Sequence, residues 1–211
     1  RRAASTLALA ENYDELLSTI LVGNNIVNIA LSSIGTLFFI ELIGSGGAGV
    51  STASGIPDFR STDGLYHQKS REPPETIISH SYYVKRPEIF FEFYRTRMLY
   101  PSAQPNIVHH TLARWEKEGK LAAVVTQNID GLHQAAGSKN VLELHGSIHR
   151  NRCLKCAKFF PPEYIRDSAG IPKCPCGGVI KPEVVLYEEG LDDAVVAAAV
   201  HHIRQADTLI I

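Results

Sequence analysis

The feature that most restricts the fold of this 211-residue chain is a cluster of glycines directly after a long apolar segment. Residues 44–49 read Gly-Ser-Gly-Gly-Ala-Gly and satisfy the pattern G-x-G-x-x-G. Glycines at this spacing let backbone N–H groups approach a pyrophosphate, and the N-terminus of a following helix favours its negative charge. The pattern predicts a phosphate-binding loop, although a glycine-rich linker would have the same composition.

The residues after this loop are unusual for a linker. Pro57 fixes its own φ angle and pushes Ile56 toward an extended conformation. Residues 58–60 (Asp-Phe-Arg) then place an acid, an aromatic face and a bidentate cation beside the loop. This combination favours a ligand site over a flexible connection.

Composition excludes several classes of protein. Hydrophobic residues make up 45% of the chain and charged residues 20%, which is typical of a packed globular protein and not of a disordered one. The formal net charge of −1 offers no excess of positive charge for a phosphate backbone, so we expect no nucleic-acid partner. The length suits one domain with a small satellite.

The four cysteines form two close pairs, Cys153-x-x-Cys156 and Cys174-x-Cys176. This is close to the C-x₂-C-x₁₅₋₂₀-C-x₂-C zinc pattern, with the second knuckle one residue shorter. Four thiolates form a closed tetrahedral zinc site, which is structural and not catalytic. Disulfides are the competing interpretation, disfavoured because the rest of the chain is typical of a cytosolic protein. We expect a zinc ribbon over about residues 150–180.

Two apolar runs, residues 121–126 and 141–144, predict buried strands of a parallel sheet. The polar residues 127–130 follow the first run and His145 follows the second, at the strand ends where ligands bind in such sheets. Residues 127–130 are also typical of a polar turn. His145 differs from an ordinary structural histidine because Gly146 follows it and imidazole titrates near neutral pH.

Three helices are predicted, over residues 87–100, 106–118 and 192–205, followed by a strand over 208–211. Gly119 is expected to end the second helix. The first helix should bury an apolar stripe. The members of this stripe are Phe90, Phe91, Tyr94 and Met98.

Residues 16–40 contain no charged side chain. A helix of that length rises about 37 Å, enough to cross a hydrocarbon core of roughly 30 Å. A buried core helix is the alternative, because three asparagines interrupt the run and would need partners in lipid. Residues 1–42 resemble one stretch of the transmembrane domain of the CorC/CNNM family of magnesium-transport proteins. This resemblance implies an N-terminal apolar helix and a membrane contact through residues 16–40.

Three motifs in order resemble the sirtuins, the NAD-dependent protein deacylases. They are GAGVSTASGIPDFRSTDGLYHQK at residues 47–69, TQNIDGLH at 126–133 and LHG at 144–146. With the cysteine cluster, the resemblance covers about residues 46–211 and is most like bacterial members. It implies an α/β domain over residues 43–211, built on an incomplete Rossmann-like parallel sheet with a zinc ribbon and a small helical module.

The resemblance also implies a pocket for NAD. Its members would be Ala48, Thr52, Phe59, Arg60, Gln127, Asn128, Ile129, Asp130 and His145. Gln127 and Asn128 would hold the ribose on the nicotinamide side, while Ile129 and Asp130 would bind the carboxamide. Phe59 would shield the reacting carbon from water.

The implied activity is NAD-dependent protein-lysine deacetylation, which yields nicotinamide and O-acetyl-ADP-ribose from an acetyl-lysine protein or peptide. His145 would be the general base and Asn128 a second catalytic residue. No arginine stands three residues after Tyr66 to pair with an acidic acyl chain, which favours a neutral acyl group. The alternatives are a protein mono-ADP-ribosyltransferase and an inactive zinc-ribbon fragment tethered to a membrane. We expect a cytoplasmic location.

Two regions differ from the family pattern. Residues 181–187 resemble the strand that pairs with the substrate backbone, but the family usually has glycine where Glu188 stands. In sirtuins a Gly-Thr-Ser loop and further strands, which hold the adenosine half of NAD, follow the last strand of this chain at 208–211. We therefore expect a domain truncated at the C-terminus that binds NAD weakly or not at all.

Overall fold

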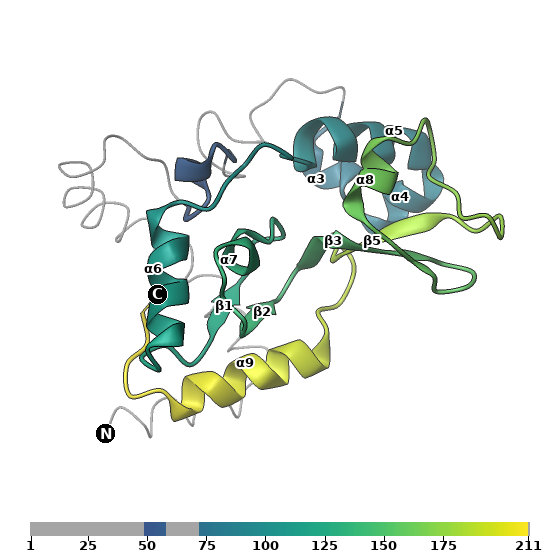
Figure 1. Cartoon of the computed structure of the whole chain (residues 1–211). Helices are drawn as coiled ribbons and strands as arrows, with labels where there is room; N and C mark the ends of the chain where they lie inside the picture. The colour runs from purple at the N-terminus through teal and green to yellow at the C-terminus, as the bar shows by residue number, and fades with distance from the viewer. Residues whose placement is uncertain (1–48, 58–71, 211) are drawn as a thin grey trace.

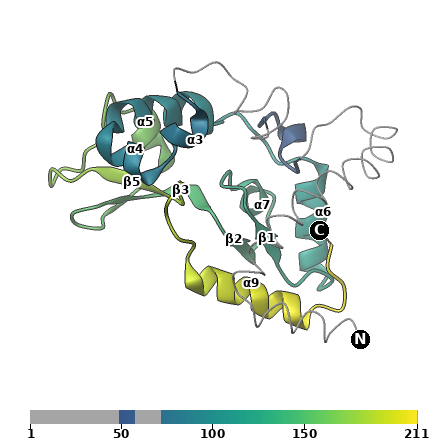
Figure 2. The ribbon, with the colours of Figure 1, turned by 180° about the vertical axis from the view of Figure 1, so that it is seen from behind.

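The computed structural model describes residues 49–57 and 72–210. These residues form a parallel-sheet part around β1 and β2 and, at the other end of the molecule, a smaller part with an antiparallel sheet and short helices (Figures 1 and 2). Three predicted features lie outside the described residues: the apolar helix over 16–40, the pocket residue Ala48, and Phe59 with Arg60. Within the described ranges, no helix is both long enough and apolar enough to cross a membrane.

The parallel sheet is confirmed by the pairing of β1 (Val124–Thr126) with β2 (Val141–Glu143). The short helix α7 (Leu132–Ala135) lies on the connection between them. Strand β1 is shorter than predicted because the N–H groups of residues 120–121 both bond to the carbonyl of Trp115 and wrap the end of the preceding helix. The predicted burial of this strand is wrong, since none of residues 121–126 is buried and Val125 is 38% exposed.

Two longer helices flank the parallel sheet. Helix α6 (Ile107–Lys117) is capped by Asn106, and α9 (Asp193–Gln205) is capped by Asp192, whose carboxylate accepts from the N–H of Ala194 at 2.8 Å. Both helices were predicted within a residue of these bounds. Helix α9 runs alongside β1 and β2 (Figure 1). The predicted final strand is wrong over residues 208–210, which form no strand.

The antiparallel sheet has the strand order β4-β3-β5. Its strands are β3 (Gly146–Cys153), β4 (Phe159–Phe160) and β5 (Ile180–Val184). Helix α8 (Pro162–Arg166) follows β4. The register of β3 against β5 shifts between Ser147 and Asn151. This sheet is the predicted ribbon, and β3 leads into it directly from His145.

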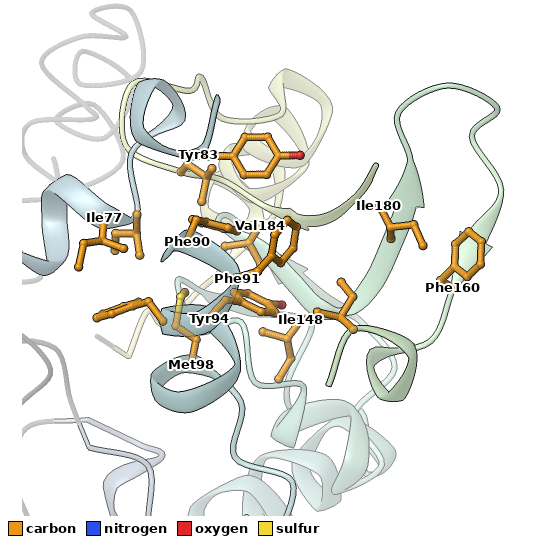
Figure 3. Close-up of a cluster of buried hydrophobic side chains, with 14 of the residues drawn as sticks. Ile77, Tyr83, Phe90, Phe91, Tyr94, Met98, Ile148, Phe160, Ile180 and Val184 are labelled. Carbon is orange, nitrogen blue, oxygen red and sulfur yellow. The ribbon is translucent and has the colours of Figure 1, made fainter. Parts of the chain in front are cut away.

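The helical module packs on this sheet through an aromatic core (Figure 3). It consists of α3 (Pro74–Ile77), α4 (His80–Lys85), α5 (Pro87–Phe93) and the π-helical turn η3 (Tyr94–Met98). The predicted stripe is confirmed, since all four of its side chains are buried. Burying a large apolar side chain contributes about 1.5–3 kcal/mol, so this stripe holds the module in place.

Arg95 joins the helical module to the ribbon. Its Nε donates to the carbonyl of Ile165 at 2.8 Å, and its Nη2 donates to Oγ of Ser168 at 2.9 Å and to the carbonyl of Gly170. The guanidinium lies 5.7 Å from the ring centroid of Phe91. One planar cation therefore satisfies three acceptors, one in α8 and two in the loop after it, while it packs on the core.

We predict that Gly146→Ala unfolds the junction between the two sheets. Gly146 has φ +75°, and a Cβ there would lie 1.9 Å from the carbonyl oxygen of Glu183 on β5. We expect urea unfolding to show a loss of at least about 3 kcal/mol, because backbone strain adds to a clash that nothing flexible relieves. The matched control is Gly119→Ala, which has φ +72° and no atom within 4 Å of its Cβ. It should lose only about 1–2 kcal/mol, and equal losses would contradict this account.

Candidate functional site

The glycine loop meets the polar residues after β1 through Ser51. Its hydroxyl donates to Oδ2 of Asp130 at 2.6 Å, and its oxygen accepts from Nδ2 of Asn128 at 3.0 Å. Ser51 is buried. Ser51 was not among the predicted site residues, and its signal in the sequence is its place inside the Gly-Ala-Gly-Val-Ser run. It joins two predicted site segments far apart in the chain.

The loop itself is a compact turn. Residues 49–51 lead into the 3₁₀ turn η1 (Thr52–Ser54), which Gly55 ends at φ +83°. A short turn therefore stands where the sequence predicted a helix. The Thr52 hydroxyl donates to the carbonyl of Gly49 at 2.8 Å, so it stabilises the turn from within.

Asn106 anchors the loop from outside. Its Nδ2 donates to the carbonyl of Val50 at 2.6 Å and lies 2.9 Å from Oγ of Ser54. Its Oδ1 accepts from the N–H of Val108 at 2.9 Å. The N-cap residue of α6 thus holds both ends of the turn, and the loop cannot shift without disturbing that helix.

The segment after β1 is clamped onto β3. The N–H of Ile148 donates to the carbonyl of Ile129 at 3.0 Å, and Nε2 of His149 lies 2.8 Å from the carbonyl oxygen of Asp130. Gly131 has φ +72°, and a Cβ there would lie 2.5 Å from the His149 ring. Only glycine therefore allows this close packing.

The Asp130 carboxylate has two roles. Oδ2 accepts the Ser51 hydroxyl, while Oδ1 accepts the N–H of Leu132 at 2.9 Å at the start of α7. Hydrogen bonds to an ionised acceptor are about twice as strong as neutral ones. This carboxylate therefore couples the glycine loop to the end of the parallel sheet.

His145 lies between the end of β2 and the start of β3 and is half-buried. Its carbonyl accepts from the N–H of Val185 at 3.0 Å. Burial lowers the pKa of its imidazole below the usual 6.5, while a hydrogen bond with the backbone of Gln127 acts in the opposite direction. The ring is therefore neutral near pH 7 and adjoins the polar segment after β1. A neutral imidazole in this position can accept a proton.

The four cysteines converge as predicted, with their sulfur atoms all within 4.8 Å of one another. The Sγ–Sγ distances are 3.5 Å for Cys153–Cys176, 3.7 Å for Cys156–Cys174 and 3.5 Å for Cys156–Cys176. A tetrahedron with Zn–S bonds of about 2.3 Å has edges of about 3.8 Å. A disulfide needs about 2.05 Å. The donor set therefore fits zinc and not disulfides.

The ribbon backbone favours the thiolate form of one of these ligands, Cys153. Burial raises the pKa of its thiol, but hydrogen bonds from the backbone of Cys156 and Lys155 bring the pKa down to about 6. Backbone hydrogen bonds also lower the pKa of Cys156 and Cys174, but the neighbouring thiols and burial raise it overall. Gly178 allows the close approach of the backbone to Cys153, because a Cβ there would lie 2.6 Å from the Cys153 sulfur. Metal binding requires deprotonated thiols, so a bound cation would displace the remaining protons.

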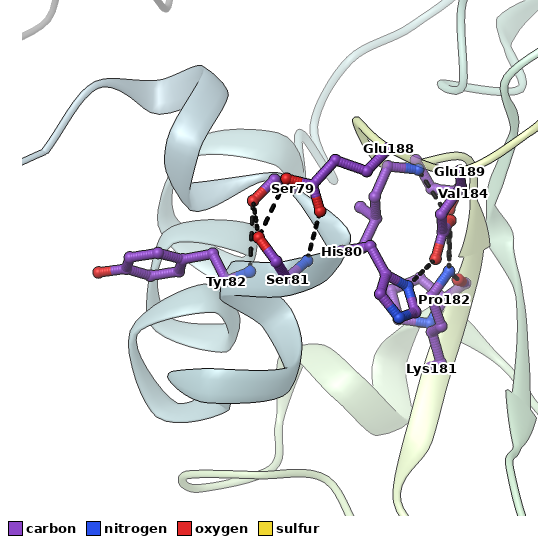
Figure 4. A network of polar contacts seen from close by, with 10 residues as sticks. Ser79, His80, Ser81, Tyr82, Lys181, Pro182, Val184, Glu188 and Glu189 are labelled. Atoms are coloured by element: carbon purple, nitrogen blue, oxygen red, sulfur yellow. Dashed lines mark hydrogen bonds and ion pairs between the residues drawn. The ribbon is translucent and has the colours of Figure 1, made fainter.

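A polar network joins the segment after β5 to helix α4 (Figure 4). Glu188 accepts from the N–H and the hydroxyl of Ser81 at 2.9 and 3.0 Å. Glu189 contacts His80 Nδ1 at 2.8 Å and Lys181 Nζ at 3.1 Å. Glu188 has φ +75°, a conformation that a non-glycine residue keeps only when its surroundings hold it.

Two family models match the chain. The Sir2 family model matches residues 47–211, and the model of the Cyclin M transmembrane N-terminal domain matches residues 1–57. The first match covers most of the chain, which belongs to the Sir2 family. The second confirms the resemblance of the N-terminal residues to that membrane-protein family. Residues 47–57 belong to both matches.

Relatives and solved structures agree with the Sir2 match. The NAD-dependent protein deacetylase of Clostridium acetobutylicum is 55% identical over 192 residues, which cover 89% of this chain and 76% of that protein. A Sir2 structure with a deacetylated p53 peptide and 3′-O-acetyl-ADP-ribose has a TM-score of 0.66 and 36% identity, covering 78% of this chain and 70% of that one. A Sir2 homologue in complex with NAD has a TM-score of 0.66 and 39% identity, covering 76% and 62%.

We predict that the purified protein carries about one zinc ion per chain. Removing it with a strong chelator should speed amide exchange in residues 153–178, since the ribbon loses the ligand that joins its two ends. Exchange in α9, at the other end of the molecule, should stay unchanged. Metal analysis and hydrogen–deuterium exchange measure both effects.

The matched variants for the zinc prediction are Cys174→Ser and Lys173→Ala. The first removes one thiolate and should lose the metal, while the second changes the exposed neighbouring residue and should keep it. Full zinc occupancy in Cys174→Ser would contradict the four-cysteine site.

Proposed function

We propose that this chain is an NAD-dependent protein-lysine deacetylase that releases nicotinamide and O-acetyl-ADP-ribose. One observation carries the proposal: the imidazole of His145 is hydrogen-bonded to the Gln127 backbone, in the segment where Ser51 joins Asn128 to Asp130. A general base thus stands beside polar groups at the carboxyl ends of two parallel strands, where such sheets bind ligands. The relatives named NAD-dependent protein deacetylases support this assignment.

The residues of the site fit NAD. The donor and acceptor set combines a side-chain amide at Asn128, a carboxylate at Asp130 and the backbone of the glycine turn, and these groups suit ribose hydroxyls and a carboxamide. Thr52, Gln127, Asn128, Ile129 and Asp130 are the described residues that would hold it, with Ala48, Phe59 and Arg60 of the same motif completing the pocket. NAD supplies the ADP-ribosyl group that accepts the acetyl group and the nicotinamide that leaves.

His145 is assigned the proton transfer. Its neutral ring would accept a proton from a ribose hydroxyl, and Asn128 would orient that ribose. The backbone carbonyl of His145 bonds to Val185, so the base is tied to the segment that follows β5. A positioned base of this kind contributes about 10²–10⁴ in rate.

The substrate is assigned as an acetyl-lysine peptide. Residues 184–187 run beside His145 at one end and pair with Ser79 at the other, which places an extended segment next to the base. A second extended chain can add to such a segment by backbone hydrogen bonds. The lack of an arginine three residues after Tyr66 favours a neutral acyl group.

Three further features stay predictions. They are the domain boundary near residue 43, a membrane contact through residues 16–40 and a cytoplasmic location.

We predict that His145→Ala lowers nicotinamide release by at least about 100-fold, because the variant lacks the general base. The assay uses the zinc-loaded chain with an acetyl-lysine peptide and NAD titrated into the millimolar range. The control is His201→Ala on the exposed side of α9, which should keep wild-type rates. Radiolabelled NAD distinguishes the products, since labelled protein in place of acetyl-ADP-ribose would indicate a mono-ADP-ribosyltransferase.

The pH profile provides a separate prediction. His145 works in its neutral form, and burial lowers its pKa below 6.5. As pH falls, kcat/KM should therefore decrease with a midpoint below pH 6.5, because protonation removes the base. A midpoint above pH 6.5 would show that the base is another group or that its imidazole is not desolvated.

A further inference from the structure

Two buried imidazoles, on helices α6 and α7, lie close to the proposed NAD site and take no part in the proposed chemistry. His109 is the third residue of α6 and His133 the second residue of α7. Their side chains are 0% and 4% exposed, and the ring centroids are 4.7 Å apart. Within the described part of the chain, no group bonds to Nε2 of His109 or Nδ1 of His133. Burying ring nitrogens without hydrogen-bond partners destabilises the folded state, which indicates that the two histidines have another role.

Among the described residues, the imidazole of His109 makes one hydrogen bond, and its partner is the residue that holds the glycine loop. Its Nδ1 accepts from the N–H of Asn106 at 3.3 Å. The Asn106 side chain in turn holds the loop through Val50 and Ser54. Between those two anchors stands Ser51, whose hydroxyl contacts Asp130. Asn106 is therefore the one residue that links the His109 ring to the glycine loop.

His133 lies on the side of Asp130, the partner of Ser51 in the contact with the glycine loop. It follows Asp130 by one turn, in the helix whose first N–H the Asp130 carboxylate accepts. The paired rings thus pack the first turn of α6 against α7. Helix α6 begins after Asn106, which holds the glycine loop. Helix α7 begins beside Asp130, whose carboxylate accepts the hydroxyl of Ser51 from that loop.

Both rings are neutral under working conditions. Burial lowers the pKa of His109 to about 4, with His133 and His110 acting in the same direction and the Asp130 carboxylate against it. Burial also lowers the pKa of His133, opposed by Asp130 and Glu143. Since Nδ1 of His109 accepts a hydrogen bond from the N–H of Asn106, Nε2 carries the hydrogen in this neutral tautomer. The acceptor that Asn106 needs is therefore present at neutral pH.

We propose that His109 is a positioning residue of the NAD site: with its ring held against His133, it fixes Asn106 and so sets the glycine loop against Asn128 and Asp130. The inference rests on the proposed function for its consequence in NAD binding. The positioning itself is a property of the unliganded protein. It can be measured without NAD.

The first test compares His109→Leu, which keeps the volume but has no acceptor, with His109→Asn, whose Oδ1 replaces Nδ1. Hydrogen–deuterium exchange at pH 7.5 is followed in residues 50–56 of the zinc-loaded chain. In His109→Leu these amides should exchange about tenfold faster, the effect of leaving the part-buried N–H of Asn106 without its acceptor. His109→Asn should restore slow exchange, and the exposed neighbour variant His110→Ala should match the wild type. Unchanged exchange in His109→Leu would overturn the proposal.

The second test is a double-mutant cycle with Asn106→Asp, which keeps the cap of α6 but loses the donors to Val50 and Ser54. Each single variant should raise the Kd for NAD about tenfold with kcat within about twofold, and the double variant should also stay near tenfold because both act on one path. An additive loss of about a hundredfold, or equal losses in kcat and NAD affinity, would overturn the proposal.

A wild type that neither binds NAD nor releases nicotinamide would count against the proposed function. The exchange experiment, which needs no NAD, would then decide whether His109 positions the loop.

Discussion

The contact of Ser51 with Asp130 and Asn128 is the interaction on which the rest of the site depends. It is the point where a glycine turn near the start of the described chain reaches the end of the parallel sheet. The bond from Ser51 to Asp130 is 2.6 Å long and part-buried, so water competes with it less than with a surface contact. Because the Asp130 carboxylate also accepts the N–H of Leu132, the first residue of α7, loss of this bond would affect both the loop and the helix.

The junction between the two sheets determines where His145 stands. Strand β3 begins one residue after this histidine and continues into the ribbon, so the base lies where the parallel sheet ends and the antiparallel one begins. The buried carboxylate of Glu143, at the end of β2, is paired with Arg150 on β3 at 2.6 Å, and Arg150 also contacts Glu183 on β5. A buried carboxylate needs such a partner, and this one ties three strands together around the base.

The zinc ribbon and the helical module share one core, although they come from separate segments of the chain. The aromatic side chains of α5 pack on the ribbon sheet, and Arg95 completes the contact with α8 and the loop after it. A three-stranded sheet of this size has little core of its own, so a metal at one end and an aromatic helix on one face stabilise it jointly. The extended segment after β5 then lies between this module and His145.

Features that depend on near neighbours could be read from the amino-acid sequence. The cap at Asp192, the apolar stripe over residues 90–98 and the cysteine spacing each follow from interactions within a few residues or from a ligand set with known geometry. These three predictions were confirmed within the described residues. The residue types at the ends of β1 and β2 also predicted where a polar site would form, and the roles of those residues stay a prediction.

Which distant groups meet depends on the folded arrangement of the whole domain. The partners of Ser51, the buried pair of His109 and His133, and the shortening of β1 by the end of α6 all depend on segments brought together by packing. The strand predicted over residues 208–210 is absent because an apolar β-branched run forms a strand only when a neighbouring strand supplies its hydrogen bonds. Local patterns specify elements, whereas burial and pairing across the fold select the contacts between them.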